Sequence, residues 1–367
     1  MKLAWLKRRI HTRYLCGGLL ALIVYLLLVS TNLVQAADTR IAFMSTRSER
    51  NGEIFVMNPD GKRVRRLTKH PQYDAVPAWS PDGQKITFMS FRDEHRIQVN
   101  GIILGDIYVM NADGTNPINL TQSVERPEGA SSWSPDGEQI VFRSAKYFKW
   151  DILFHSDIWV MDADGGNPRN LTNHHAQDSS PDWSPDGMQI VFHSDRNMDW
   201  EFNAHREKNW EVFVMNADGT NLINLTNHPA GDGSPAWSPD GRQIAFSSNR
   251  DKKDINDENI EIYVMNADGT NPINLTNHPA KDSSPDWSPD GRQIVFTSDR
   301  DRNDDGTKNL EIYVMNADGT NPINITNHPK RDGQSSWGSV RPLRVSSKGR
   351  LVTLWGKVKR GNTYGVK

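Results

Sequence analysis

The chain has 367 residues, 36% hydrophobic content and a formal net charge of −2. This length and composition allow a large buried core and exclude a chain that is disordered throughout. Five basic residues lie near the N-terminus, so the rest of the chain carries about −7, which argues against nucleic acid or an anionic membrane surface as the main partner.

Residues 1–36 have the pattern of an export signal. A basic start is followed by an apolar run from about Leu15 to Val29 and by Val34-Gln35-Ala36, a small-residue cleavage site. The alternative is an uncleaved N-terminal membrane anchor, although the run is slightly short for a span of roughly 20 residues. Both hypotheses place the remaining chain outside the cytoplasm, as a periplasmic or secreted protein. The only cysteine, Cys16, lies in this segment, so we expect no disulfide in the mature protein.

Residues 37–338 consist of six repeats. A fixed period of about 50 residues is typical of a repeat architecture. The first motif is a tryptophan, usually followed by Ser-Pro-Asp-Gly, and the second is Val-Met-Asn-Ala-Asp-Gly or a close variant. The tryptophans lie 50 or 54 residues apart, at Trp79, Trp133, Trp183, Trp237, Trp287 and Trp337. The second motif begins at Val56, Val109, Val160, Val214, Val264 and Val314.

Each repeat contains four short predicted strands separated by turn motifs. In one copy these strands are residues 284–287, 293–298, 311–316 and 323–326. The middle two carry uninterrupted apolar runs, which are typical of strands covered on both faces. No stretch after the signal has a convincing helical period. We therefore predict an all-β protein, a six-bladed β-propeller of four-stranded antiparallel blades.

The two ends of the repeat region complement each other. Ile41–Ser45 has the pattern of a second strand without a tryptophan strand before it, and Ser335–Trp337 is a tryptophan strand without a matching second strand after it. We expect these segments to close the first blade with strands from both termini, because an unclosed ring would leave open sheet edges. Residues 339–367 form a basic C-terminal tail whose role the sequence does not indicate.

The two repeated motifs resemble those of TolB-type propellers, whose WD40-like repeats are called PD40. They are also similar to repeats in the propeller domains of prolyl-oligopeptidase-type enzymes. The resemblance covers about residues 41–337 and implies a six-bladed propeller. For the TolB type it would add a periplasmic role in holding together an envelope-spanning protein complex. That type carries an α/β domain before its propeller, and only a few residues precede the first strand here, so we expect a TolB-like propeller without that domain.

Six acidic residues lie five positions before the tryptophans. They are Asp74, Glu128, Asp178, Asp232, Asp282 and Asp332. If the tryptophan strand is innermost, these acids lie near the mouth of the central channel, where a ring of carboxylates would raise some of their pKa values or hold a cation. The alternative is that each acid caps its own loop.

Histidines recur in the same loops, and we favour loop packing over a metal cluster for them, because equivalent side chains of a ring are held apart. They are His70, His174, His228, His278 and His328. A separate candidate is the acidic segment with Asp299, Asp301, Asn303 and Asp305, which resembles a calcium loop. Counted from Asp301, its twelfth position is Ile312 instead of the glutamate that such a loop requires. We expect no cofactor, with calcium at this loop as the one candidate.

The loop between the second and third strands is short in the first repeat and long in the next three. These long loops carry two histidines, His155 and His205, and six aromatic residues: Tyr147, Phe148, Trp150, Phe154, Trp200 and Phe202. Aromatic anchors on a rigid scaffold suit recognition of a protein or a carbohydrate. The alternative is that they fold back over their own blades.

Together these patterns predict an exported, monomeric and non-catalytic module that binds a protein partner through the face with the long loops. One alternative is a metal-dependent polysaccharide lyase or hydrolase at the channel mouth, and another is a calcium-dependent carbohydrate binder. The sequence has no Gly-x-Ser-x-Gly, phosphate-loop or His-Glu-x-x-His motif. A propeller surface does not by itself identify its ligand.

Overall fold

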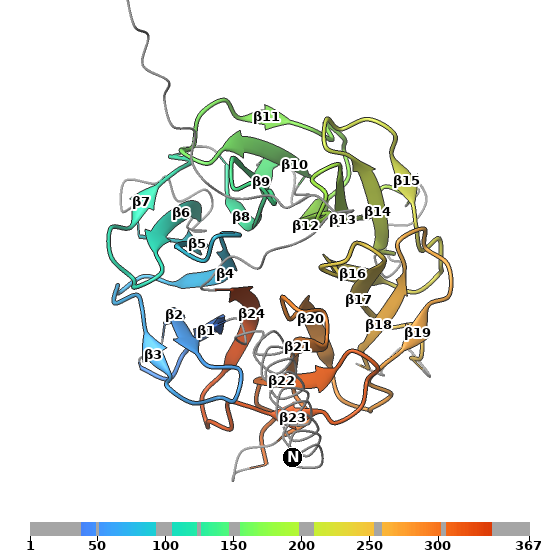
Figure 1. The fold of residues 1–367 in the computed structure, drawn as a ribbon. Helices are drawn as coiled ribbons and strands as arrows, with labels where there is room; N and C mark the ends of the chain where they lie inside the picture. Colours follow the sequence, from blue (N-terminus) through green and yellow to red (C-terminus); the bar gives the residue numbers. More distant parts are fainter. Residues whose placement is uncertain are drawn as a thin grey trace, which may run out of the picture. The chain divides into compact units, whose positions relative to one another are not determined.

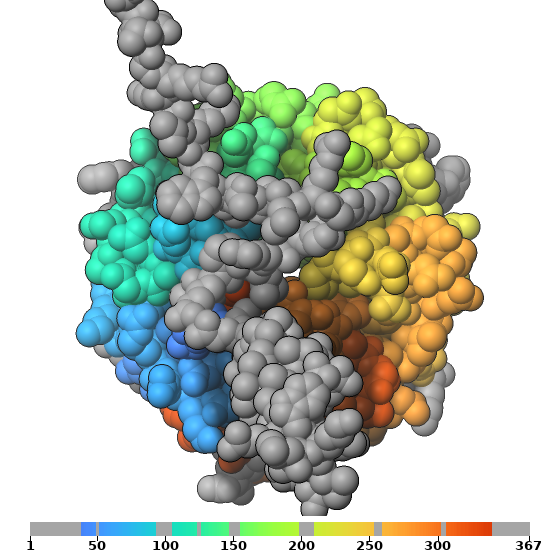
Figure 2. All heavy atoms as spheres, in the orientation of Figure 1, coloured from blue at the N-terminus to red at the C-terminus, as the bar shows by residue number. Residues whose placement is uncertain are grey.

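The computed structural model describes residues 38–48, 51–92, 105–122, 126–146, 155–197, 209–252, 259–301 and 306–339. Its strands all lie within the unit formed by residues 39–367. They form six four-stranded antiparallel sheets, which lie side by side as blades around a central axis (Figures 1 and 2). The prediction of an all-β, six-bladed propeller is confirmed. Within the described ranges, no helix is long and apolar enough to cross a membrane.

Every blade has the same strand plan from the axis outward (Figure 1). The innermost strands are β4 (Asp74–Trp79), β8 (Glu128–Trp133), β12 (Asp178–Trp183), β16 (Asp232–Trp237), β20 (Asp282–Trp287) and β24 (Asp332–Ser339). The second strands are β1 (Thr39–Ser45), β5 (Lys85–Ser90), β9 (Gln139–Lys146), β13 (Gln189–Ser194), β17 (Gln243–Ser248) and β21 (Gln293–Ser298). The third strands are β2 (Glu53–Met57), β6 (Asp106–Asn111), β10 (His155–Asp162), β14 (Glu211–Asn216), β18 (Glu261–Asn266) and β22 (Glu311–Asn316). The short outer strands are β3 (Arg65–Arg66), β7 (Ile118–Asn119), β11 (Arg169–Asn170), β15 (Ile223–Asn224), β19 (Ile273–Asn274) and β23 (Ile323–Asn324).

The first blade is closed by strands from both ends of the propeller, as predicted. Its order is β24-β1-β2-β3. Ile41 of β1 pairs with Trp337 of β24, and Arg40 pairs with Gly338. The last strand therefore supplies the innermost position of the blade that the first strand begins.

The hydrophobic core lies between neighbouring blades. Val141 and Val160 of one blade pack against Trp183, Phe192 and Phe213 of the next. Phe192 is fully buried, and burial of such a side chain contributes about 1.5–3 kcal/mol. The equivalent clusters recur around the ring. Packing between blades, on both faces of each sheet, therefore holds the ring together.

The Asp-Gly motifs form turns, as the sequence predicts. Asp186 accepts hydrogen bonds from the Ser184 hydroxyl at 2.6 Å and from the Met188 amide at 3.0 Å, and Gly187 has a φ of 72°. Gly219 has a φ of 89°, and a Cβ there would lie 2.7 Å from the Leu171 carbonyl oxygen of the preceding blade. Only glycine satisfies both conditions.

The antiparallel order places the connections on two opposite faces. We call the face with the Ser-Pro-Asp-Gly and Asn-Ala-Asp-Gly turns the turn face. The opposite face carries the connections between second and third strands and the first residue of each innermost strand. We call it the loop face. The predicted long loops join strands at this loop face.

Candidate binding site at the central channel and the loop face

The six acids that precede the tryptophans are the first residues of the innermost strands. All are buried, and none is more than 4% exposed. Five of them form ion pairs with an arginine of their own blade. These pairs are Asp74–Arg92 (2.8 Å), Asp178–Arg196 (2.8 Å), Asp232–Arg250 (2.9 Å), Asp282–Arg300 (2.6 Å) and Asp332–Arg47 (2.5 Å). Burial raises the pKa values of Asp74, Asp282 and Asp332, and the arginine charge opposes that rise.

Each of these arginines also lies over two aromatic rings of its blade. Arg196 lies 5.3 Å from the ring centre of Phe192 and 5.1 Å from that of Phe213, distances at which a cation is attracted by the ring. The burial and the pairing favour the hypothesis that the acids serve their own blades over that of a cation-binding ring. The arginines were not singled out from the sequence, although Ser-x-Arg recurs at the end of five second strands: Arg47, Arg92, Arg196, Arg250 and Arg300.

The blade formed by β8–β11 departs from this scheme. Glu128 replaces the aspartate, and Lys146 stands where the other blades have the arginine. Glu128 accepts a hydrogen bond from the Ser144 hydroxyl at 3.5 Å, whereas Lys146 is exposed. This blade therefore lacks the aspartate–arginine ion pair that the other five blades share.

The repeat histidines take part in loop closure. The Nδ1 atom of His228 accepts the Ala230 amide at 3.1 Å, and its own amide donates to Glu211 at 3.0 Å. The same Nδ1 contact occurs at His70, His174, His278 and His328. Among the described residues, no group of three or more metal-ligating side chains converges.

In the calcium-loop candidate, the structure describes Asp299 and Asp301, whereas Asn303 and Asp305 lie outside the described residues. Asp301 accepts hydrogen bonds from the Tyr313 hydroxyl and from Asn324 at 2.6 Å. Asp299 pairs with Lys308 at 3.1 Å. Asp251 makes the same two contacts with Tyr263 and Asn274 in the preceding blade. These two acids thus have protein partners.

The loop aromatics Tyr147, Phe148, Trp150, Phe154, Trp200 and Phe202, and also His205, lie outside the described residues. The third of these loops ends close to Trp210, whose ring lies edge-on to His193 at 4.8 Å between centroids. His155 is described, and its Nδ1 atom contacts the backbone carbonyl of His175. The predicted aromatic binding face therefore stays a prediction.

Two aspartates of the innermost strands connect neighbouring blades. Asp182 accepts the Ser132 hydroxyl from the preceding blade and the Trp237 amide from the following one, both at 2.8 Å. Asp286 accepts the Trp337 amide of the following blade at 2.7 Å and the Trp287 amide of its own strand at 2.8 Å. Each residue keeps part of its surface open, while its carboxylate lies inside the protein.

The electrostatics of this pair follow from that position. Burial and, to a lesser extent, the negative charge of Asp182 raise the pKa of Asp286 to about 7. Burial also raises the pKa of Asp182. These two residues lie outside the features shared by all repeats, although their position differs between repeats, with Ala78, Ser132, Ala236 and Ser336 in the other four blades.

A second variable position follows the buried phenylalanine of each second strand. It is occupied by Met44, Met89, Arg143, His193, Ser247 and Thr297. At His193, the Nδ1 atom accepts the Ser234 amide of the next blade at 3.1 Å. Burial and the charge of Arg143 lower the pKa of His193 to about 4, so the imidazole is neutral at pH 7. This position was not singled out from the sequence.

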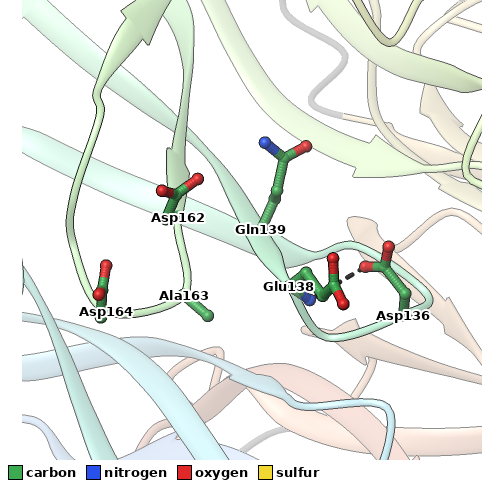
Figure 3. Close-up of a pocket in the computed structure, with 6 residues that line it drawn as sticks. All are labelled: Asp136, Glu138, Gln139, Asp162, Ala163 and Asp164. Atoms are coloured by element: carbon green, nitrogen blue, oxygen red, sulfur yellow. Dashed lines mark hydrogen bonds between the residues drawn. The ribbon is translucent and has the colours of Figure 1, made fainter. Parts of the chain in front are cut away.

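A shallow acidic pocket of about 510 Å³ opens on the turn face of the β8–β11 blade (Figure 3). It is lined by Asp136, Glu138, Gln139, Asp162, Ala163 and Asp164. Asp136 accepts a hydrogen bond from the Glu138 amide at 3.0 Å (Figure 3). Asp162 accepts one from Asn167 at 2.7 Å, and Asp164 accepts one from the Gly166 amide at 2.9 Å. Turn-forming hydrogen bonds account for these three acids.

Comparison with known proteins yields two family matches. The TolB beta propeller domain (PD40) matches residues 38–199, and the Tricorn protease N-terminal beta propeller domain matches residues 150–261. Both families are propellers, and together the matched ranges span most of the blades.

Individual relatives are more distant. An uncharacterized protein of Agrobacterium fabrum is 28% identical over 53% of this chain and 60% of its own length. The Tol-Pal system protein TolB of Alcanivorax borkumensis is 30% identical over 30% of this chain and 24% of its own length. The matched segments thus span less than two thirds of either relative. The crystal structure of TolB from Acinetobacter baumannii aligns with 82% of this chain and 66% of its own, with a TM-score of 0.63 and 20% identity, which shows a shared fold.

Proposed function

Since the chain is a TolB-like six-bladed β-propeller, we propose that it is a protein-binding module of the cell envelope, with its partner on the loop face. The main support is the distribution of differences between the repeats. The shared acids, arginines and aromatic residues are occupied within the blades, as with Asp178 and Arg196. The long loops and the variable position of the second strands differ between blades. The residues that the repeats share thus stabilise the scaffold, and positions that differ between the repeats of such a scaffold are typical of a binding surface.

The relatives supply a second line of support. One of them is by name a Tol-Pal system protein, and the export signal predicted for residues 1–36 would bring this chain to the same side of the inner membrane. We infer a periplasmic or secreted monomer without catalytic activity. The identity of its partner is a separate question, because one scaffold hosts many functions.

The experiment is affinity capture with the full chain as bait in envelope extract of the source organism. We expect a partner that is retained by the wild type and lost when Trp150 and Trp200 are both replaced by alanine, because aromatic anchors dominate such interfaces. Met188→Ala is the matched control, since Met188 is 69% exposed on the turn face. If the double variant retains the partner and Met188→Ala loses it, the binding site lies on the turn face and the proposed loop-face site is wrong.

A further inference from the structure

Arg143 differs from the polar side chains at its position in three other blades, because a guanidinium can only donate hydrogen bonds and those side chains accept one. In three blades this position accepts the backbone amide of a residue in the next blade's innermost strand. The three contacts are Ser234 to His193 (3.1 Å), Ser284 to Ser247 (3.1 Å) and Gln334 to Thr297 (3.2 Å). Each donating residue has a positive φ and lies at a bulge of its strand.

The same bulge recurs in β12, the strand that follows Arg143 around the ring. Ser180 has a φ of 49°, the register shifts between Ser179 and Asp182, and β9 packs against β12. A guanidinium has five N–H donors and no acceptor. Arg143 therefore cannot accept the Ser180 amide as His193 accepts that of Ser234. The packing of β9 against β12 therefore brings two donors to this junction, whereas the three junctions above hold a donor and an acceptor.

Within the part of the chain that the structure describes, the guanidinium also lacks a compensating partner. Among the described residues, none accepts a hydrogen bond from Arg143, and its Nε atom is buried without a partner. Arg143 is partly buried, and this burial lowers its pKa. Burying a charge without a compensating partner costs free energy. The neighbouring His193 is neutral and supplies no counter-charge.

An anionic acceptor would complete this junction. A carboxylate matches a guanidinium with two parallel hydrogen bonds, and its oxygens can also accept a backbone amide. The site lies on the loop-face half of the second strand, since Arg143 precedes the loop-face end of β9 by three residues. We propose that Arg143 and the Ser180 bulge bind a carboxylate that the protein partner presents at the loop face. This inference rests on the proposed function, because it names the group by which the partner is recognised.

The test measures binding of a blocked tri-glutamate peptide to the full chain by calorimetry, with a blocked tri-glutamine peptide at the same ionic strength as the reference. We expect saturable binding of tri-glutamate only, weakened at least tenfold in Arg143→Met. Methionine is the natural residue at this position in two other blades, so the variant should fold. Arg169→Met is the matched control, because it removes the same charge from the exposed outer strand of the same blade and should leave the affinity unchanged.

Equal binding of the two peptides, or full affinity in Arg143→Met, would overturn the inference. The melting temperature without peptide gives an independent readout. Arg143→Met should melt at the same or a higher temperature than the wild type if the arginine awaits a ligand, and at a lower one if it is a structural residue, which would also overturn the inference.

Failure of this inference and failure of the proposed function are distinguishable. If tri-glutamate binding is absent while the Trp150 and Trp200 double variant still loses a captured partner, only the carboxylate site is wrong. If tri-glutamate binding depends on Arg143 but the captured partner is retained equally by wild type and Arg143→Met, the site takes a free carboxylate and the partner assignment is wrong.

Discussion

Arg196 donates hydrogen bonds to both carboxylate oxygens of Asp178, at 2.9 and 2.8 Å, across 18 residues of sequence. The two side chains join the loop-face ends of the first and second strands of one blade. The aspartate is fully buried and the arginine is 10% exposed. The contact that the repeats conserve at the loop face is therefore an internal one.

Replacing Asp178 by alanine should lower the free energy of unfolding by about 3 kcal/mol, because it leaves a buried arginine without its counter-charge. Urea denaturation measures the change. The free energy of unfolding should decrease less in the double variant Asp178→Ala with Arg196→Met than in Asp178→Ala alone, since the double variant also removes the arginine charge that lacks a partner. A double variant that loses the sum of the two single changes would show that the residues act independently.

Asp286→Asn should change how stability depends on pH. The pKa of Asp286 is raised to about 7 from 3.8, so its stabilising contribution is full below pH 3.8 and is lost as the pH rises through 7. Between pH 5 and pH 8 this group should lower the wild type's free energy of unfolding by at most about 3 kcal/mol. The asparagine variant should lack this decrease. Asparagine has one side-chain oxygen and therefore loses one of the two hydrogen bonds that Asp286 accepts. This loss lowers the free energy of unfolding by the same amount at both pH values.

The measurement compares urea midpoints of wild type and Asp286→Asn at pH 5 and pH 8. The urea midpoint of the variant, relative to that of the wild type, should be higher at pH 8 than at pH 5. A difference that is constant between the two pH values would contradict the raised pKa.

Gly219→Ala should destabilise the propeller more than Gly187→Ala. Both glycines have positive φ values, 89° and 72°, so both variants carry a backbone cost of about 1–2 kcal/mol. At Gly219 the new Cβ would also lie 2.7 Å from a backbone oxygen of the preceding blade, whereas at Gly187 its nearest neighbour is 3.8 Å away. Equal melting temperatures of the two variants would show that neighbouring blades can move apart to accommodate the new Cβ without a loss of stability.

Calcium should give no heat on titration, and chelator should leave the melting temperature unchanged. Asp301 already accepts from Tyr313 and Asn324, and Asp299 lies beside the positive charge of Lys308. Calorimetry on the wild type and on Asp301→Ala with Asp305→Ala tests this expectation. A heat seen in the wild type and absent from that variant would establish a calcium site in the loop.

The architecture could be predicted from the sequence because each repeat is locally complete. The strand predicted at residues 293–298 is β21 with the same bounds, and the one at residues 311–316 is β22. The closure also followed, because Ile41–Ser45 and Ser335–Trp337 each lack the strand that the other supplies. Periodicity carries this information without any knowledge of contacts.

The side-chain partners could not be predicted in the same way. The acids were expected in the loops before the innermost strands, whereas they are the first residues of those strands. Their arginines lie two residues beyond the ends of the second strands, and the repeated Ser-x-Arg motif shows the pairing only once the strand register is known. The hydrogen bonds of Asp182 and Asp286 could be predicted even less, because they join different blades. Whether their carboxylates reach amides of the adjacent blades is decided by how the blades pack around the axis.

The pairing of Ile41 with Trp337 also fixes the order in which the ring can form. Since β24 is the last strand of the propeller to be synthesised, the first blade lacks its innermost strand until all the others have been made. During synthesis, the β1–β3 segment therefore presents an unpaired edge for longer than any other part of the ring. A mutation that weakens the pairing of β1 with β24 should therefore reduce the yield of folded protein more than its equilibrium stability.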